Sequence, residues 1–508
     1  MKKTILRIML ALFLVSAFAS VSKLRPAKGL AGTVYIRADG SVEGTAYIES
    51  NDNVTYVFTS DIRDSVVVER SNIVIDGNGR TLNVSGLTGA NGFFLANVNN
   101  VTIKKTNIVG SGSGIAVSQS SGNVIVGNSI TNSSIGISID SQSSENIVSG
   151  NRMADVGTGV FSGMGASNNV ISENTIEGER YYGIRPSGFN NVVSGNNISA
   201  RYDHEDMAGI YLEDSIYTRV SGNKIENSKI GIWVGDWAES GNISGNTMLS
   251  SYCGMHLTGL SLYNRIHGNS IEGAEMCSIV SYASYNYIYH NNIITDNATG
   301  VQIIEGHSFW DDGYPSGGNY WSFLDPTGAD LFSGLYQNET GSDGILDQPF
   351  AIQGNSIDHY PLAGSISTFS AGTLNETKYD FDVISNSSVT NFTFNLTANP
   401  PTLSFDVEGT NGTDGFCRAT IPKDAMWCDS PEQWIIMAGD ETILQRKVVE
   451  ESGYTYIYFT YTDSTRTIQI ESTHAIPEFP SRVIMLVLMA VTALTIVVCR
   501  RKRSHLIL

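Results

Sequence analysis

The stretch Asn123-Val-Ile-Val-Gly-Asn-Ser-Ile130, followed shortly by Gly136-Ile-Ser-Ile139, recurs with small changes from about residue 99 to residue 304. In each copy an Asn, once replaced by Thr, precedes x-Ile or x-Met, and the period is roughly 22 to 23 residues with one longer step. A fixed period in this range is typical of a solenoid. The recurring position is occupied by Thr106, Asn128, Asn151, Asn174, Asn196, Asn223, Asn246, Asn269 and Asn291.

Each copy also places two apolar residues five positions apart, as in Ile125 and Ile130. One straight strand would point them to opposite faces, so a corner must lie between them. Gly127-Asn128 supplies it, because Gly and Asn tolerate the left-handed conformation best. The pattern therefore predicts a parallel β-helix of roughly ten to twelve coils with three strands per coil, right-handed by the general crossover preference. A leucine-rich or helical solenoid would need the L-x-x-L-x-L pattern or helical periodicity, and the sequence has neither.

The repeat predicts internal columns of like residues, one residue per coil. Ile130, Met153, Ile176 and Ile225 should stack in one apolar column. Asn side chains in a second corner should form an amide ladder, as in other in-register sheets. Its members are Asn123, Asn146, Asn169, Asn191, Asn264 and Asn286.

Composition excludes some classes of function. The net charge of −19 and the pI near 4.8 argue against a nucleic-acid partner, which would favour a basic face. Charged residues make up 16% and Gly is abundant at 51 residues, which favours a corner-rich β protein over a helical or disordered one.

The two ends predict export and membrane attachment. Lys2, Lys3 and Arg7 precede a short apolar run, so residues 1–31 are interpreted as a signal peptide, cut after Ala19 or after Ala31. Val483–Cys499 is apolar and is followed by four basic residues, which predicts a membrane helix with a cytoplasmic tail. The remainder would lie on the extracellular face, where sequons such as Asn53, Asn132, Asn197, Asn297, Asn386 and Asn411 suit a glycoprotein.

Cysteine spacing predicts one disulfide and leaves a second open. Cys417 and Cys428 bracket a short stretch, and outside the cell a bridge between them is expected. Cys253 and Cys277 fall on adjacent coils in nearly matching register, so a second bridge is the alternative to two free thiols.

The predicted domains follow from these features. After the signal, residues 32–98 form an N-terminal cap and the first coils, and residues 99–305 form the regular coils. Residues 306–364 are rich in Trp, Asp and Gly and close the solenoid. Residues 366–475 alternate apolar and polar side chains in seven or eight short strands, which predicts an antiparallel β-sandwich acting as a spacer or docking domain. Residues 476–508 hold the tail.

One outward column of the coils is a candidate ligand-binding stripe. Two positions after the Gly of successive coils, the side chains should face solvent. They are Phe161, Arg185, Tyr211, Trp233 and His256. Glu213, Asp214 and Asp236 lie beside them, and the longer coil adds Asp203, His204, Glu205 and Asp206.

Rings flanked by carboxylates suit a sugar chain, and three interpretations stay open. The stripe binds polysaccharide or envelope glycans without turnover, or it is an aromatic ladder that protects a sheet face. The third is catalysis, either by Glu213 and Asp236 as the carboxyl pair of a glycoside hydrolase or by a polysaccharide lyase with Arg185 or Arg219 as proton acceptor.

Residues 309–362 carry a resemblance to a known family. Trp310-Asp-Asp-Gly-Tyr314, Asn319-Tyr-Trp-Ser322 and Asp343-Gly-Ile-Leu-Asp347 follow the coils, and with them the chain from about Asn72 to Leu362 resembles the NosD-like secreted β-helix proteins, common on archaeal surfaces. The resemblance implies the right-handed fold and offers an alternative role as an accessory factor in copper-site maturation. The His residues are scattered singly, and the sequence predicts no cofactor apart from calcium, for which Asp311, Asp312, Asp343 and Asp347 are weak candidates.

The tail carries a second resemblance. Ile476-Pro-Glu-Phe-Pro480 before the apolar run is similar to the Pro-Glu-Phe sorting signals of archaeal surface proteins. It implies that the helix is removed and replaced by a lipid, whereas plain membrane spanning is the alternative.

Overall fold

The computed structural model describes residues 32–200, 208–295, 300–303, 306–353, 356–374, 377–396, 398–451, 453–462 and 465–476. Contacts divide the chain into two compact units. The first comprises residues up to Asp312 with Trp321–Leu324 and Pro349–His359, and the second comprises Gly313–Tyr320, Asp325–Gln348 and the chain from Tyr360 onward. The predicted signal peptide, the inserted residues 203–206 and the predicted membrane helix Val483–Cys499 lie outside the described residues.

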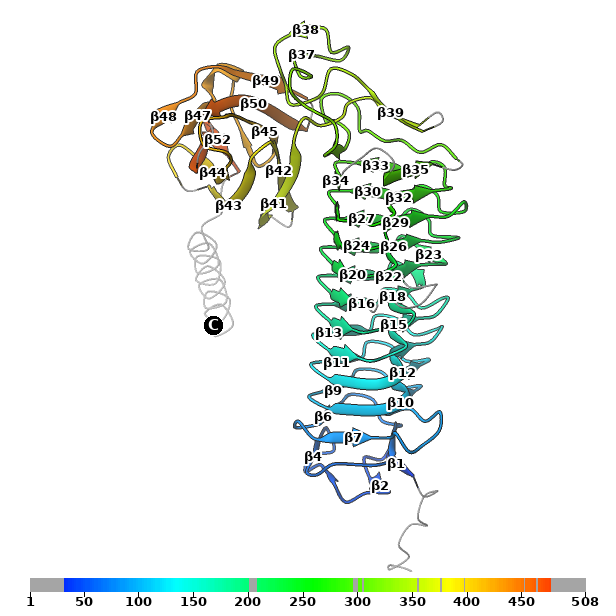
Figure 1. Cartoon of the computed structure of the whole chain (residues 1–508). Helices are drawn as coiled ribbons and strands as arrows, with labels where there is room; N and C mark the ends of the chain where they lie inside the picture. The colour runs from blue at the N-terminus through cyan, green and yellow to red at the C-terminus, as the bar shows by residue number, and fades with distance from the viewer. Residues whose placement is uncertain are drawn as a thin grey trace, which may run out of the picture. The chain divides into compact units, whose positions relative to one another are not determined.

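The first unit is a parallel β-helix of about ten turns, as the repeat predicts (Figure 1). Face 1 is a 12-stranded sheet in which every neighbour pair is parallel except the first. Its strands are β3 (Ile48–Glu49), β4 (Thr55–Phe58), β6 (Ile73–Asp76), β9 (Val101–Lys104), β11 (Val124–Val126), β13 (Ile147–Ser149), β16 (Val170–Ser172), β20 (Val192–Ser194), β24 (Arg219–Ser221), β27 (Asn242–Ser244), β30 (Arg265–His267) and β33 (Tyr287–Tyr289).

Faces 2 and 3 belong to one 22-stranded sheet, because β10 (Asn107–Ser118) and β12 (Ser129–Ile139) run through the corner between them. Face 2 follows the recurring Asn and contains β7 (Thr81–Asn83), β14 (Arg152–Ala154), β17 (Thr175–Glu177), β21 (Asn197–Ser199), β25 (Lys224–Glu226), β28 (Thr247–Leu249), β31 (Ser270–Glu272) and β34 (Asn292–Ile294).

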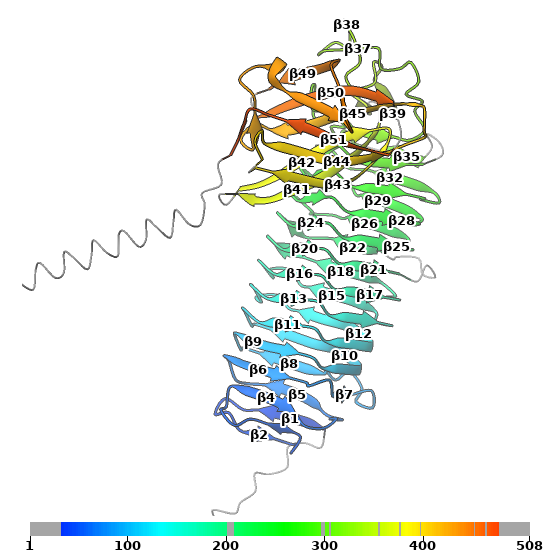
Figure 2. The same cartoon turned by 90° about the vertical axis from the view of Figure 1, so that its left-hand side faces the viewer.

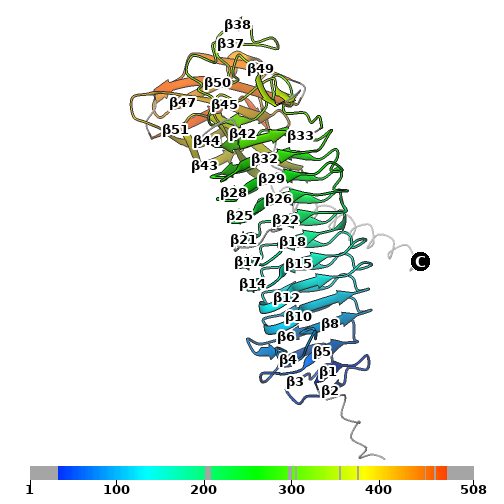
Figure 3. The ribbon, with the colours of Figure 1, turned by 45° about the vertical axis from the view of Figure 1, so that its right-hand side comes forward.

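Face 3 follows the recurring Gly, and Figure 3 shows its strands one above another. They are β8 (Phe93–Ala96), β15 (Thr158–Ser162), β18 (Tyr182–Pro186), β22 (Ala208–Leu212), β26 (Ile230–Val234), β29 (Cys253–Leu257), β32 (Cys277–Ser281) and β35 (Val301–Ile303). At the N-terminal end, β1 (Thr33–Ile36), β2 (Val42–Glu43) and β5 (Ser65–Val68) join the same sheet, and β19 (Gly188–Phe189) pairs with β23 (Ser215–Ile216) at a corner.

The register confirms the predicted apolar column. Ile130 pairs with Met153, Met153 with Ile176, and Ile176 continues through Ile198 to Ile225. All of these side chains are fully buried in one hydrophobic cluster that runs the length of the coils. The corner forms as expected, since Gly127 and its equivalents adopt left-handed φ angles near +60°.

Two amide ladders stabilise the corners. The predicted one links Asn123, Asn146, Asn169 and Asn191 by Nδ2 to Oδ1 hydrogen bonds of 2.9 to 3.2 Å. It stops where Thr218 and Gly241 replace Asn, and it resumes between Asn264 and Asn286. The second ladder is longer and uses the recurring Asn itself, from Asn128 to Asn291, with donor–acceptor distances of 2.9 to 3.1 Å. Within each ladder an amide therefore has hydrogen-bond partners in the coils on both sides, whereas Asn191, at the end of its ladder, has them in its own coil and the preceding one.

Two tryptophans of the Trp-rich segment belong to the core of the β-helix. Trp310 and Trp321 are about 1% exposed, and their ring centroids are 6.0 Å apart. The Trp321 indole donates to Asp358 Oδ2 at 2.8 Å. The ring of Phe350 packs on Trp321 at 4.9 Å, so this segment covers the apolar core.

The second unit contains two five-stranded antiparallel sheets, most of whose strands are labelled in Figure 2. One is β41 (Ser365–Leu374), β42 (Thr377–Ser385), β45 (Asp414–Pro422), β50 (Tyr454–Thr462) and β49 (Arg446–Glu450). The other is β43 (Ser388–Asn395), β44 (Thr402–Glu408), β51 (Arg466–Glu471), β47 (Ile435–Ala438) and β48 (Glu441–Thr442). Residues of both sheets share one hydrophobic cluster.

Short elements complete the described chain. They are β36 (Tyr320–Trp321), β37 (Phe332–Ser333), β38 (Glu339–Thr340), β39 (Phe350–Gln353), β40 (Ser356–Asp358), β46 (Met426–Trp427), β52 (His474–Ala475) and the 3₁₀ turn η2 (Pro431–Gln433). None of the helices within the described ranges has the length and apolar character needed to cross a membrane.

Candidate functional site

The predicted stripe is a real column on face 3. Phe161 on β15 pairs in register with Arg185 on β18, Tyr211 on β22 pairs with Trp233 on β26, and Trp233 pairs with His256 on β29. Five successive coils thus bring these side chains together, because each strand pairs with its counterpart one coil away.

The rings of the column stack on one another. Ring centroids are 4.6 Å apart for Tyr211 and Trp233 and 5.5 Å for Trp233 and His256, and Tyr182 stacks on the other side of Tyr211 at 5.0 Å. Tyr211 is only 9% exposed. Neighbouring rings therefore flank Tyr211 and Trp233 on both sides, with the Tyr211 and Trp233 ring planes tilted by 40° to each other. This packing leaves less of their ring faces for a sugar than the sequence predicted.

Arg185 extends the column toward the N-terminal coils. Its guanidinium carbon lies 5.4 Å from the Phe161 ring centroid and 5.5 Å from that of Tyr211, within the range of cation–π attraction. The guanidinium also forms an ion pair with Glu213. Burial, together with the charge of Glu213, raises the pKa of the Tyr211 phenol, so the phenol stays protonated.

The weak catalytic candidates are not set up as a pair. The Glu213 carboxylate is engaged by Arg185, and Asp236 is exposed. Asp214 and Asp236 occupy the same position in adjacent coils, and the Asp214 amide donates to the Asp236 carbonyl at 3.0 Å. His256 is half-buried with no hydrogen-bond partner for Nε2, and burial lowers the pKa of its imidazole.

A groove of about 500 Å³ borders the stripe at Phe161 and Arg185. It crosses four coils, and most of its lining comes from the turns that follow the face-3 strands. The lining residues are Ser118, Gln119, Asp140, Ser141, Gln142, Phe161, Gly163, Met164, Arg185 and Ser187. Gln119 donates from Nε2 to Gln142 Oε1 at 3.3 Å, so the two amides are aligned along the groove.

Sequence reasoning found two of these residues and missed the turn residues. Gln119, Asp140, Gln142 and Met164 are exposed and follow the third strand of successive coils. The recurrence of a polar or flexible side chain at the same turn position of adjacent repeats is the sequence feature that could have identified these groove residues. The predicted stripe ends with the strands, whereas most of the groove lining lies in the turns beyond them.

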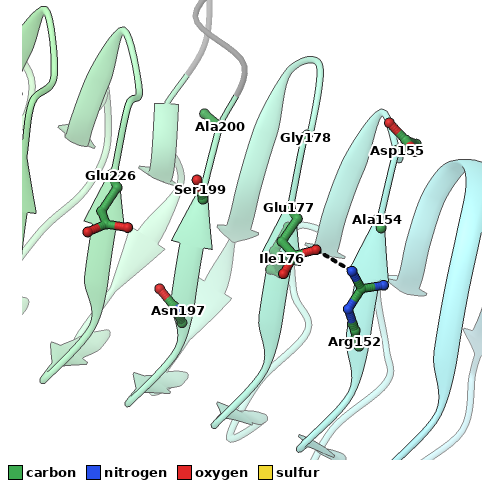
Figure 4. Close-up of a pocket in the computed structure, with 10 residues that line it drawn as sticks. All are labelled: Arg152, Ala154, Asp155, Ile176, Glu177, Gly178, Asn197, Ser199, Ala200 and Glu226. Atoms are coloured by element: carbon green, nitrogen blue, oxygen red, sulfur yellow. Dashed lines mark hydrogen bonds and ion pairs between the residues drawn. The ribbon is translucent and has the colours of Figure 1, made fainter.

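Two further hollows lie on the other faces. The face-2 hollow, of about 560 Å³, is shown in Figure 4 with Arg152 and Glu177 joined by an ion pair of 2.5 Å. Glu226, also in its lining, pairs with Lys224 at 2.6 Å. The face-1 hollow, of about 630 Å³, is lined by Tyr217 and Arg219 with small and amide side chains. The face-2 lining has no aromatic ring, and its Arg152, Glu177 and Glu226 side chains form ion pairs, which makes it a weaker ligand site than the groove at Phe161.

The sequence matches the model of one protein family along the coils. That family is described as periplasmic copper-binding protein (NosD), and the matches cover residues 30–155, 71–242 and 142–328, which together span more than half of the chain. The chain belongs to the NosD family. No curated protein matches the sequence.

Solved structures match this NosD-family chain at low identity and low TM-score. They include the catalytic domain of a GH87 α-1,3-glucanase in complex with nigerose (16% identity, 53% of this chain and 59% of that one, TM-score 0.35). An alginate lyase from Paenibacillus sp. str. FPU-7 matches at 14% identity over 53% of this chain and 98% of that one (TM-score 0.33). The Dettilon tailspike protein matches at 13% over 82% and 85% (TM-score 0.36). The chain thus spans 59% of the glucanase domain, and the likeness concerns the fold alone.

The description of the NosD family names copper, so the described side chains would have to include a set of copper ligands. Copper favours converging imidazole, thiolate or thioether groups. Within the described ranges, no group of three or more His, Cys, Asp or Glu side chains is close enough to hold a metal ion. Cys253 and Cys277 are two soft ligands in contact, without a third acidic, thiol or imidazole group gathered around them. The described residues therefore do not fit a copper centre built from three or more His, Cys, Asp or Glu side chains.

The weak calcium candidates are likewise engaged separately. Asp311 binds His359 through Nδ1 at 2.8 Å, and Asp347 accepts the amides of Leu331 and Phe332 at about 3.0 Å. Asp343 is buried beside Arg418. Within the described part of the chain these carboxylates and Asp312 do not converge on one ligand set.

The predicted Cys417–Cys428 disulfide is not formed in this structure, which holds both cysteines as thiols. Cys417 Sγ lies 3.7 Å from Ser385 Oγ, and Cys428 Sγ lies 3.4 Å from the Thr473 amide. The reason is the extended backbone between them. The chain continues along β45 for five residues after Cys417, roughly 17 Å, and then enters β46, which pairs with β52 instead of returning along β45.

Proposed function

We propose that this NosD-family chain is an exported, non-catalytic binding protein that holds a stretch of extended polysaccharide in the groove beside Phe161. The observation that carries the proposal is the groove itself, in which exposed amide, hydroxyl and carboxyl groups lie next to one half-buried aromatic ring.

The dimensions and chemistry of the groove suit a sugar chain. Four coils at about 4.8 Å spacing make a path of roughly 14 Å, long enough for a short run of sugar rings. Gln119, Gln142 and Ser141 offer donors and acceptors to hydroxyl groups, and Phe161 offers an apolar surface. Equivalent side chains recur once per coil along the β-helix axis, as hydroxyl groups recur once per unit along a polysaccharide. The ligand would therefore lie along the β-helix axis.

Charge narrows the ligand class to a neutral polysaccharide. The chain carries a net charge of −19, and Asp140 is exposed in the groove. The one cation in the lining, Arg185, is already paired with Glu213. A polyanionic chain would meet repulsion without a free cation to offset it.

The count of carboxyl groups in the groove supports binding without hydrolysis. Glycoside hydrolysis commonly uses two carboxyl groups that flank the scissile bond. The groove lining contains one, Asp140. The aromatic column at Tyr211 and Trp233 serves in this proposal as the rigid wall of the groove.

The remaining parts of the chain would place the groove outside the cell. In this proposal the first 31 residues direct export, the antiparallel sheets pack as a β-sandwich spacer, and the tail from Ile476 attaches the protein to the membrane as a helix or, after sorting, through a lipid. Protease accessibility of the groove in intact cells would test this placement.

A glycan array with the full-length purified protein tests the binding directly. We expect neutral polysaccharides to bind, and we expect Phe161→Ala to weaken that binding at least tenfold with little change in stability. Phe332→Ala is the matched control, because Phe332 is a 40% exposed phenylalanine of the other unit. Equal binding by wild type and Phe161→Ala would contradict the groove, and release of shortened sugars after long incubation would contradict the absence of turnover.

A further inference from the structure

Two buried cysteines face each other on adjacent coils of face 3. Cys253 on β29 pairs directly with Cys277 on β32, and their sulfur atoms are 2.8 Å apart. Cys253 is 5% exposed and Cys277 is fully buried. They lie in an outward column next to the aromatic one, within a small hydrophobic cluster with Ala208, Ile230 and Val280.

The direct pairing of these two residues on adjacent strands is compatible with a disulfide. Adjacent strands of a sheet are about 4.8 Å apart, so directly paired Cα atoms fall inside the roughly 4.4 to 6.8 Å that disulfides span. The sulfur atoms point toward each other, and closing the bond requires only side-chain rotation. By contrast, Cys417 Sγ contacts Ser385 Oγ, and Cys428 Sγ contacts the Thr473 amide.

We propose that Cys253 and Cys277 form a disulfide bond that links two adjacent coils of the β-helix. In the reaction the two thiols lose two protons and two electrons and one S–S bond forms. The electrons pass to an external disulfide, which is reduced to two thiols by exchange. An exported protein meets such oxidants, since secreted and periplasmic compartments favour disulfides.

The link lies where the regular packing of the coils is interrupted. A Gly recurs on face 3 up to Gly254, and a Cβ added there would lie 2.7 Å from the Ser278 carbonyl and 2.3 Å from an Ile271 methyl group. In the next coil Ser278 takes the place of Gly, and its hydroxyl is buried without a hydrogen-bond partner. A disulfide at Cys277, the residue before Ser278, would hold the coil with this buried hydroxyl group against the preceding coil.

Alkylation and mass spectrometry of the full-length protein test the bond. The protein, purified without reductant, is unfolded and treated with iodoacetamide before and after reduction. We expect Cys417 and Cys428 to be labelled at once, whereas Cys253 and Cys277 should be labelled only after reduction and should appear in one linked peptide before it. Labelling of both Cys253 and Cys277 without reductant would overturn the proposal. So would thiols that are protected only when Cu(I) is added, which would indicate metal binding.

Thermal unfolding tests the effect of the bond on the coils. Reductant should lower the midpoint of the β-helix transition in the wild type by a few degrees. It should not lower that of Cys253→Ala/Cys277→Ala, and Cys417→Ala serves as the control that keeps the shift. Equal effects of reductant on the wild type and on the double variant would show that this pair does not hold the coils.

Discussion

Arg185 and Glu213 form an ion pair across adjacent coils, and the guanidinium lies between the rings of Phe161 and Tyr211. The pair joins the groove to the aromatic column, because Arg185 belongs to both. It also accounts for the carboxylate that sequence reasoning considered for catalysis.

Replacement of Glu213 by Gln should lower the free energy of unfolding by about 1 kcal/mol, since the charge-assisted hydrogen bond is lost in a half-buried site. Urea unfolding at low and high salt measures the loss, which should shrink as salt rises. The matched control is Glu177→Gln, because Glu177 also pairs with an Arg one coil away but the two side chains are 54% and 45% exposed. A loss at Glu177 as large as that at Glu213 would contradict the role of burial.

The aromatic column should be structural. Tyr211→Ala and Trp233→Ala should each lower the free energy of unfolding by about 2 to 4 kcal/mol, because each removes a packed ring and its stacking on both neighbours. Tyr217→Ala should change it by less than about 0.5 kcal/mol, since Tyr217 is 59% exposed. If Tyr211→Ala and Trp233→Ala kept full stability and lost only sugar binding, the rings would be contact residues instead.

Glu179 should make the β-helix less stable as pH rises. Its carboxyl is fully buried with neither oxygen hydrogen-bonded, and burial raises its pKa to about 7. The folded state therefore holds a proton that the unfolded state releases near pH 4.5, so the contribution is present below pH 4.5 and is lost as pH rises through 7. The full effect is about 3 kcal/mol.

Glu179→Gln should remove this part of the pH dependence. Its unfolding midpoint in denaturant should equal that of the wild type near pH 4.5 and exceed it at pH 8. A variant that is less stable than the wild type at pH 8 would show that the ionised carboxylate has a favourable partner.

Arg418 in the second unit should be essential for stability. It is 2% exposed, donates to the Asp343 carbonyl at 2.6 Å and to the Pro315 carbonyl, and lies 3.9 Å from the Asp343 carboxylate. Arg418→Met should lower the free energy of unfolding of this unit by about 3 to 5 kcal/mol, because it leaves the buried Asp343 without its cation. Arg418→Met/Asp343→Asn should recover part of the loss in the same denaturation assay, and an unchanged loss would assign the effect to the carbonyl contacts alone.

Local sequence rules were enough for the coils. Gly127 and Asn128 predicted the corner, and the spacing of Ile125 and Ile130 predicted that a corner was needed. The same residue pattern recurs in every coil, so the prediction of each column rests on many copies of one local pattern. The recurring Asn from Asn128 to Asn291 predicted the corner of each coil, but not the second amide ladder that the same side chains form.

The prediction of the candidate site was partial. Phe161 and Arg185 were predicted as outward neighbours, and both line the groove. Tyr211 is less exposed than predicted. Strand alternation predicts that its side chain points outward, but it does not predict that the rings of neighbouring coils cover it. The Cys417–Cys428 bridge failed for a related reason, since short separation in sequence does not bring two residues together when the intervening chain is a strand.

The sequence by itself determined the β-helix, the register of its coils and the two-sheet character of the C-terminal region, since these depend on periodicity and on the conformations that Gly and Asn allow. Only the tertiary structure decided which outward side chains are covered, which carboxylates have partners and which cysteines meet. Those properties depend on atoms from different coils approaching within a few ångströms. Arg185 and Glu213, 28 residues apart in the chain, meet because one coil of the β-helix lies on the next.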